Sequence, residues 1–210
     1  MTSDVERRRQ AIAAGHSGDL ELAKSFLTDP KAKVRSAAIS SLQKLGKLSD
    51  QILKNALIDQ SAEVRIRAIE LATKSSTEIP IFLLQDQEHS VVETACWALG
   101  EKKDVGKTAI KELIKITNSH EDQLSREAAV AALGSIGDFD GLDAILSALK
   151  DRPAIRRRAT IALAAFDDPR VEDALKESLR DRDWQVRQAA EDLLDNRKDE
   201  NFIEIRSNKK

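Results

Sequence analysis

Residues 34–38 read VRSAA, residues 64–68 read VRIRA, residues 155–159 read IRRRA and residues 186–190 read VRQAA. Two degenerate copies of the same pattern lie between them, at residues 91–95 (VVETA) and 125–129 (SREAA). We call the first residue of each copy its anchor. Successive anchors are 27 to 34 residues apart, and spacing this regular indicates an internal repeat.

Each copy is predicted to form two helices. From the anchor onward, apolar residues recur at +4, +8 and often +11, as Val34, Ala38, Leu42 and Leu45 illustrate, and this spacing places one apolar stripe on one helical face. A shorter amphipathic stretch precedes each anchor and ends in an Asp in most copies. Glycines at +12 in two copies, Gly46 and Gly137, are typical of helix C-caps.

A helix pair of about 30 residues cannot bury its own apolar stripe, so the pairs must stack. The sequence therefore predicts an all-α fold, a right-handed α-solenoid of about six helix pairs preceded by a helix over residues 4–14. We expect one solenoid domain over residues 1–198. Residues 199–210 break the pattern and are assigned to a C-terminal tail that either docks as a cap or stays mobile.

The composition fits such a stack and narrows the function. Of the 210 residues 41% are apolar but only 3% are aromatic, so the core must be built from Ala, Leu, Ile and Val. A net charge of −2 argues against a dedicated nucleic-acid binder. The single cysteine, Cys96, excludes an intrachain disulfide and a cysteine-rich zinc site. No signal peptide or membrane span is expected, and we predict a cytoplasmic location.

The succession of Asp, a short gap, Val-Arg-x-x-Ala and Ala-Leu-Gly resembles the short HEAT-like repeat of the phycobilisome lyases. Residues 131–138 (AALGSIGD) and the segment from Asp181 to Arg187 carry the resemblance most clearly. The resemblance covers nearly all of residues 1–198 and implies a HEAT-like solenoid. Because this repeat serves scaffolds, lyase subunits and a few enzymes, it does not by itself imply an activity.

Several conspicuous side chains have structural explanations. The arginines that follow the anchors come about six residues after an Asp position, which predicts a ladder of Asp–Arg pairs between stacked copies. Cys96 stands at +5, where other copies carry apolar residues, so a buried inert thiol is expected. Trp184, two residues before an anchor, is expected to fill a gap between repeats.

Trp97 is different, because it occupies +6, off the apolar stripe. The +2, +3, +6 and +10 positions, which we call wall positions, should face outward on the concave side of the solenoid. Trp97 is there either a binding anchor or a side chain packed on an adjacent helix. The candidate partner-binding residues at wall positions are Trp97, Ala131, Ile161, Glu70, Glu93, Glu101, Arg157, Arg158 and Asp192.

The leading hypothesis is a non-catalytic scaffold or adaptor that binds an unidentified protein partner and needs no metal or cofactor. The sequence has no P-loop, dinucleotide fingerprint or nucleophile elbow, so we predict that the chain is not an enzyme. Two alternatives follow from the resemblance. One is a lyase-like accessory subunit that handles a chromophore or a modification together with a partner chain. The other is a DNA-binding protein similar to the alkylpurine DNA glycosylases, which would require a basic groove. The oligomeric state is left open.

Overall fold

The computed structural model describes residues 2–102 and 104–207, and the side chains of residues 198–207 are outside that description. Within this part of the chain every regular element is a helix. In chain order the elements are α1 (Asp4–Ser17), α2 (Leu20–Ser25), η1 (Phe26–Thr28), α3 (Ala32–Lys44), α4 (Asp50–Leu57), α5 (Ala62–Ala72), η2 (Ile81–Gln85), α6 (His89–Lys102), α7 (Lys107–Ser119), α8 (Gln123–Ile136), η3 (Phe139–Gly141), α9 (Leu142–Ala148), α10 (Pro153–Ala162), η4 (Leu163–Ala165), α11 (Pro169–Ser178) and α12 (Trp184–Ser207).

The predicted all-α solenoid of six helix pairs is confirmed. The six helices that begin just before an anchor, which we call anchor helices, are α3, α5, α6, α8, α10 and α12, and each follows a shorter helical segment. In the third pair that segment is only the 3₁₀ helix η2. The lone helix expected over residues 4–14 is α1, and it extends to Ser17.

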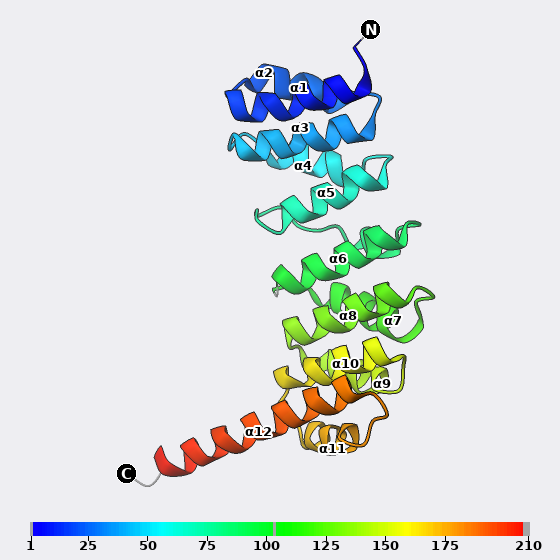
Figure 1. The fold of residues 1–210 in the computed structure, drawn as a ribbon, viewed down its shortest axis with the longest axis vertical. Helices are drawn as coiled ribbons and strands as arrows, with labels where there is room; N and C mark the ends of the chain where they lie inside the picture. Colours follow the sequence, from blue (N-terminus) through cyan, green and yellow to red (C-terminus); the bar gives the residue numbers. More distant parts are fainter. Residues whose placement is uncertain (1, 103, 208–210) are drawn as a thin grey trace. The chain divides into compact units, whose positions relative to one another are not determined.

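The chain divides into two compact units, residues 1–98 and 99–210. In the first unit α3 packs on both α1 and α5, and α2 and α4 form a second layer behind them (Figure 1). In the second unit α10 packs on both α8 and α12, with α7, α9 and α11 in the second layer (Figure 1). The division at residue 198 stays a prediction. The α12 backbone continues across it to Ser207, and the docking of the tail concerns side chains outside the described residues.

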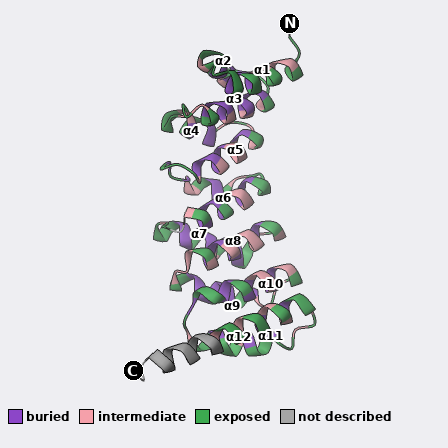
Figure 2. Ribbon diagram, turned by 60° about the vertical axis from the view of Figure 1, so that its left-hand side comes forward, coloured by how far each residue is buried: buried purple, intermediate pink, exposed green. Residues whose placement is uncertain are grey.

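The buried residues lie where neighbouring helices of a unit meet (Figure 2). Each anchor is almost completely buried, and so is the alanine at +4. The fully buried alanines at +4 are Ala38, Ala68, Ala95, Ala129, Ala159 and Ala190. A methyl group at this position lets two helix backbones approach closely while still excluding water. The apolar stripe predicted from the sequence is therefore the stripe that forms the core.

A ladder of ion pairs joins successive copies, as predicted. Arg156 of α10 donates from Nε and Nη2 to the two carboxylate oxygens of Asp181, each at 2.7 Å, and from Nη1 to the main-chain oxygen of Asp151 at 2.8 Å. Each described rung pairs an arginine with the Asp of the following copy. The five rungs are Arg7–Asp29, Arg35–Asp59, Arg65–Asp86, Arg126–Asp151 and Arg156–Asp181. Bidentate pairs of this kind fix both distance and orientation between the elements they join.

The same carboxylates also hold the loops that start the anchor helices. The Oδ1 of Asp59 accepts a hydrogen bond from the main-chain N–H of Ser61 at 2.8 Å, and the Oδ1 of Asp181 accepts one from Asp183 at 2.8 Å. Each Asp therefore satisfies a main-chain donor of its own loop and a guanidinium of the preceding copy. In the third copy Val92 takes the place of the arginine. In the last, Arg187 donates from Nη1 to the main-chain oxygen of Asp181, its one acceptor within the described residues.

Gly134, at +9 of α8, lies in close contact with α10, and replacing it should destabilise the second unit. A Cβ added to Gly134 of α8 would lie 2.5 Å from Ala162 Cβ and 2.8 Å from Ala162 Cα of α10. We expect Gly134→Ala to lower the free energy of unfolding by about 1–3 kcal/mol through overpacking. This outweighs the gain of about 1 kcal/mol that alanine brings to a helix interior. Urea denaturation of Gly134→Ala measures the difference. Gly106→Ala is the control, because nothing lies within 4 Å of a Cβ there. A more stable Gly134→Ala protein would refute the close contact.

Candidate protein-binding face

The wall positions form an exposed surface in each unit. In the second unit Nη2 of Arg158, at +3 of α10, lies 3.5 Å from Oε1 of Glu127, at +2 of α8. In the first unit Nε of Arg67, at +3 of α5, donates to Oγ of Ser40, at +6 of α3, at 2.8 Å. Wall positions of adjacent anchor helices therefore meet on one side of each unit, as side chains at matched positions of stacked helices should.

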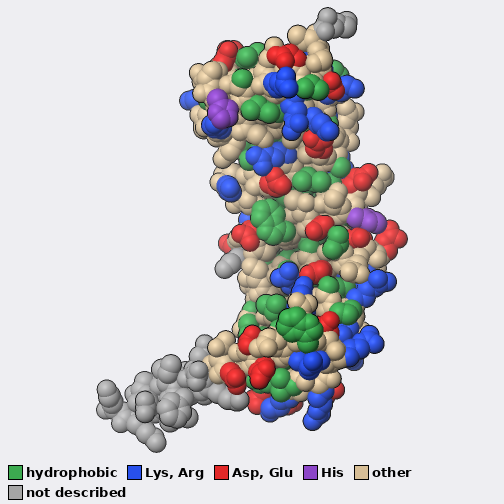
Figure 3. All heavy atoms as spheres, in the orientation of Figure 1, with side chains coloured by type: hydrophobic (Ala, Val, Ile, Leu, Met, Phe, Trp, Pro, Cys, Tyr) green, Lys and Arg blue, Asp and Glu red, His purple; other side chains and the backbone are tan. Residues whose placement is uncertain are grey.

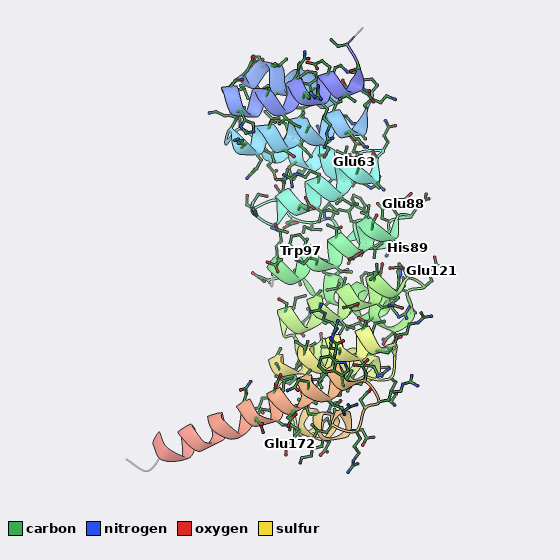
Figure 4. The ribbon with its side chains drawn as sticks, in the orientation of Figure 1. Glu63, Glu88, His89, Trp97, Glu121 and Glu172 are labelled. Atoms are coloured by element: carbon green, nitrogen blue, oxygen red, sulfur yellow. The ribbon has the colours of Figure 1, made fainter. Side chains whose placement is uncertain are left out.

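Trp97 is exposed. On α6 the Trp97 side chain (Figure 4) is 44% exposed to solvent. Its neighbours in the sequence, Cys96 and Ala98, are fully buried. Whether the exposed part of the indole serves as a binding anchor stays a prediction. On this side of the anchor helices, hydrophobic side chains stand among charged ones (Figure 3). An exposed indole in such a setting is a typical anchor for a partner.

The other apolar candidates lie in the second unit. Ile161 of α10 is 46% exposed and Ala131 of α8 is half-buried. Both are therefore available at the surface of that unit. Trp97 belongs to the first unit, so a continuous row through Trp97, Ala131 and Ile161 stays a prediction.

The charged candidates occupy the same surfaces with local partners. Glu70 accepts from Arg67 at 2.8 Å, Arg157 donates to Gln185 at 2.7 Å, and Asp192 accepts from Gln188 at 2.8 Å. Glu93 is half-buried, Glu101 and Asp192 are exposed, and Arg158 forms the pair with Glu127 described above. Exposed pairs of this kind contribute little to stability, which leaves these side chains free to exchange partners on binding.

Two expectations about individual residues have opposite outcomes. Cys96 is fully buried, as expected, and burial, together with the nearby Glu93 carboxylate, raises the pKa of its thiol to about 12. Trp184 is 64% exposed, so the expectation that it fills a gap between repeats is wrong. It lies in the first turn of the last anchor helix.

The contribution of α1 to the ladder was not predicted from the sequence. Counted from Glu6 as anchor, Arg7 occupies the ladder position, and Arg8, Arg9 and Ile12 occupy wall positions. Arg7 indeed pairs with Asp29, at 2.7 Å. The lone helix therefore has the ladder and wall positions of an anchor helix. The signal in the sequence was Arg7 itself, one copy length before Arg35.

Among the described residues no group of three or more His, Cys, Asp or Glu side chains could hold a metal ion. In the same part of the chain, no helix has a segment both long and apolar enough to pass through a bilayer. The surface groups that the structure does assemble are ion pairs, amides and isolated apolar side chains. This chemistry suits the binding of another macromolecule.

Models of the HEAT-repeat family match residues 78–155 and 110–195, which together cover more than half of the chain. A search of curated proteins found no match. Similar solved structures include the complex of CpcE and CpcF of phycocyanin lyase from Nostoc sp. PCC7120, at 24% identity and a TM-score of 0.60, covering 81% of this chain and 74% of that one.

The Escherichia coli protein YibA is also similar, at 18% identity and a TM-score of 0.62, covering 98% of this chain and 79% of that one. A designed armadillo repeat protein in complex with peptide (KR)4 gives 17% identity and a TM-score of 0.61, with 84% and 98% covered. At these identities the likeness shows a shared fold and nothing about activity. The family matches, the stacked helix pairs and the repeated Val-Arg-x-x-Ala motif lead to one conclusion: this chain is a member of the HEAT-repeat family.

Proposed function

We propose that the chain is a non-catalytic scaffold or adaptor that binds a partner protein through the wall positions of its anchor helices. The observation that carries this proposal is the 44% exposure of Trp97 on a helix whose neighbouring residues are fully buried. A large apolar side chain kept at the surface exposes area that a partner can remove from water. Tryptophan is also the residue type most enriched among interface hot spots.

The other wall positions of each unit, taken separately, support the same function. In the first unit Arg67 and Glu70 lie at wall positions as a charged pair. In the second unit Ile161 supplies exposed apolar surface, and Arg157, Arg158, Asp192 and Glu101 supply charge of both signs. Apolar contacts with mixed charges around them are the usual composition of a protein interface. Charges at the edge of an interface set association rate and selectivity more than affinity.

The fold is compatible with protein binding. Two proteins of similar fold were solved as complexes, CpcE with CpcF and a designed armadillo protein with a peptide. Stacked helix pairs present long surfaces made of equivalent positions, which suits extended partners.

Trp97→Ala should weaken binding of the partner by about 2 kcal/mol or more, the scale of an interface hot spot, while leaving the fold intact. The chain offers a matched control in Trp184→Ala, which removes the other exposed indole from a position outside the wall. The partner is first captured by a photo-crosslinking amino acid at position 97, with position 184 as reference. Its affinity for both alanine variants is then measured by calorimetry.

Fluorescence gives a direct test of burial at the same site. The chain has two tryptophans, so Trp184→Phe leaves Trp97 as the sole indole. Its emission should shift to shorter wavelength when the partner binds. Equal affinity losses in both alanine variants, or an unshifted emission at saturation, would show that Trp97 is not part of the interface. A sharply lowered melting temperature of Trp97→Ala would show that the indole stabilises the fold instead.

A further inference from the structure

A groove at the N-terminal end of the first unit is distinct from the surface around Trp97. It encloses about 630 Å³ between α1 and the start of α3, with Glu63 of α5 also in its lining. Figure 3 shows Lys and Arg side chains gathered over these first helices, and Figure 4 labels Glu63 at the start of α5. The groove therefore combines hollow shape with positive charge.

Two apolar side chains lie in the lining on the same face of α1. Val5 is 57% exposed and Ile12 is 43% exposed. A separation of seven residues places them above one another along the helix, so they form a short apolar stripe. Both side chains keep exposed surface, so the stripe can contact a ligand.

Three of the four basic side chains of the lining have no carboxylate partner among the described residues. Arg8, Lys31 and Lys33 form no ion pair within the described residues, and Arg9 reaches Glu6 only at 4.0 Å. The adjacent Arg7, by contrast, is fully engaged with Asp29. Two carboxylates, Asp4 and Glu63, also line the groove, so four positive charges face two negative ones.

We propose that this groove binds an acidic peptide segment of a partner protein, one in which aliphatic side chains recur among Glu and Asp. The aliphatic side chains would cover Val5 and Ile12, while the carboxylates would pair with Arg8, Lys31 and Lys33. A nucleic acid fits less well. The lining has no aromatic side chain on which a base could stack, whereas Val5 and Ile12 offer apolar surface that aliphatic side chains can cover.

The test uses a fluorescein-labelled peptide of repeating Leu-Glu-Glu-Leu, with a second peptide in which every Glu is Gln. Fluorescence anisotropy at low salt should show at least about tenfold tighter binding of the Glu peptide, since that charge is the main attraction. The double variant Arg8→Glu/Lys33→Glu should lose at least about tenfold in affinity for the Glu peptide. Ile12→Ser should also weaken binding, because it removes apolar surface and leaves the charges in place.

The matched control is Lys47→Glu/Lys111→Glu, which changes the net charge equally at two exposed lysines outside the groove. This variant should bind within about twofold of the parent protein. An equal loss in the control would mean unspecific attraction and would overturn the proposal. Tighter binding of single-stranded DNA of equal charge, or no binding of the Glu peptide, would overturn it too. Trp97→Ala should leave peptide binding unchanged, so failure here and failure of the surface around Trp97 are separate outcomes.

Discussion

Leu133→Ala should lower the free energy of unfolding by about 2–5 kcal/mol, through lost burial and the cavity left behind. Leu133 of α8 is 1% exposed, and its Cδ2 lies 3.1 Å from where a Cβ on Gly141 would stand. The side chain thus fills the space between its own helix and the next short segment of the second unit. Urea denaturation followed by circular dichroism measures the loss.

The control for this variant lies on the same helix. Leu124 is 52% exposed, so Leu124→Ala removes the same atoms from a solvated site and should change stability by no more than about 0.5 kcal/mol. A loss below about 1 kcal/mol for Leu133→Ala would mean that the stripe assigned to the core is not the stabilising one.

The second large effect concerns the ladder. Arg156→Ala should cost about 3 kcal/mol, because it leaves the largely buried carboxylate of Asp181 without its charged partner. The two side chains are only 7% and 15% exposed, so water can compensate the loss only in part. Arg157→Ala is the control. That neighbouring arginine donates to the exposed Gln185, and its removal should cost less than about 0.5 kcal/mol.

Acid should reduce the difference between Arg156→Ala and the parent protein. Hydrogen bonds from Arg156 hold the pKa of Asp181 below its usual value, against the opposing effect of burial. A carboxylate with a lowered pKa stabilises the fold fully above its unfolded-state pKa of about 3.9, and this contribution is lost as pH falls through the folded-state value. The two stability curves should therefore run parallel near neutral pH and converge in more acidic solution. A constant difference down to acid-induced unfolding would assign the loss to packing alone.

The fold was largely predictable because its determinants are local and repeated. The anchor residue is buried in every copy, as Val34 and Val64 illustrate, and so is the alanine at +4. The sequence therefore repeats the same buried positions six times. The ladder was predictable for the same reason. The role of α1 was not, because Glu6 replaces the apolar anchor. That position is only half-buried in α1.

The exposure of individual wall residues depended on distant neighbours. Trp97 at +6 lies beside the apolar stripe, and a side chain there is covered or open according to the size of residues on other helices. Trp184 shows the same limitation. Its predicted position in a loop did not indicate that the indole would be 64% exposed. The close contact of Gly134 with Ala162 also joins residues of different copies, and the repeat pattern does not specify the distance between them.

The ladder gives every copy that has both its Asp and its arginine two matching ends, one for each neighbouring copy. Within a unit, the guanidinium of one copy fits the carboxylate of the next, as in Arg35 with Asp59 and Arg65 with Asp86. Duplicating or deleting one such copy as a whole leaves the ion pairs on both sides closed, whereas removing part of it leaves a guanidinium or a carboxylate unpaired. The third copy, where Val92 replaces the arginine, does not have this property. Duplication of such copies in the gene can therefore lengthen the array, and deletion can shorten it, without a change to the remaining ion pairs.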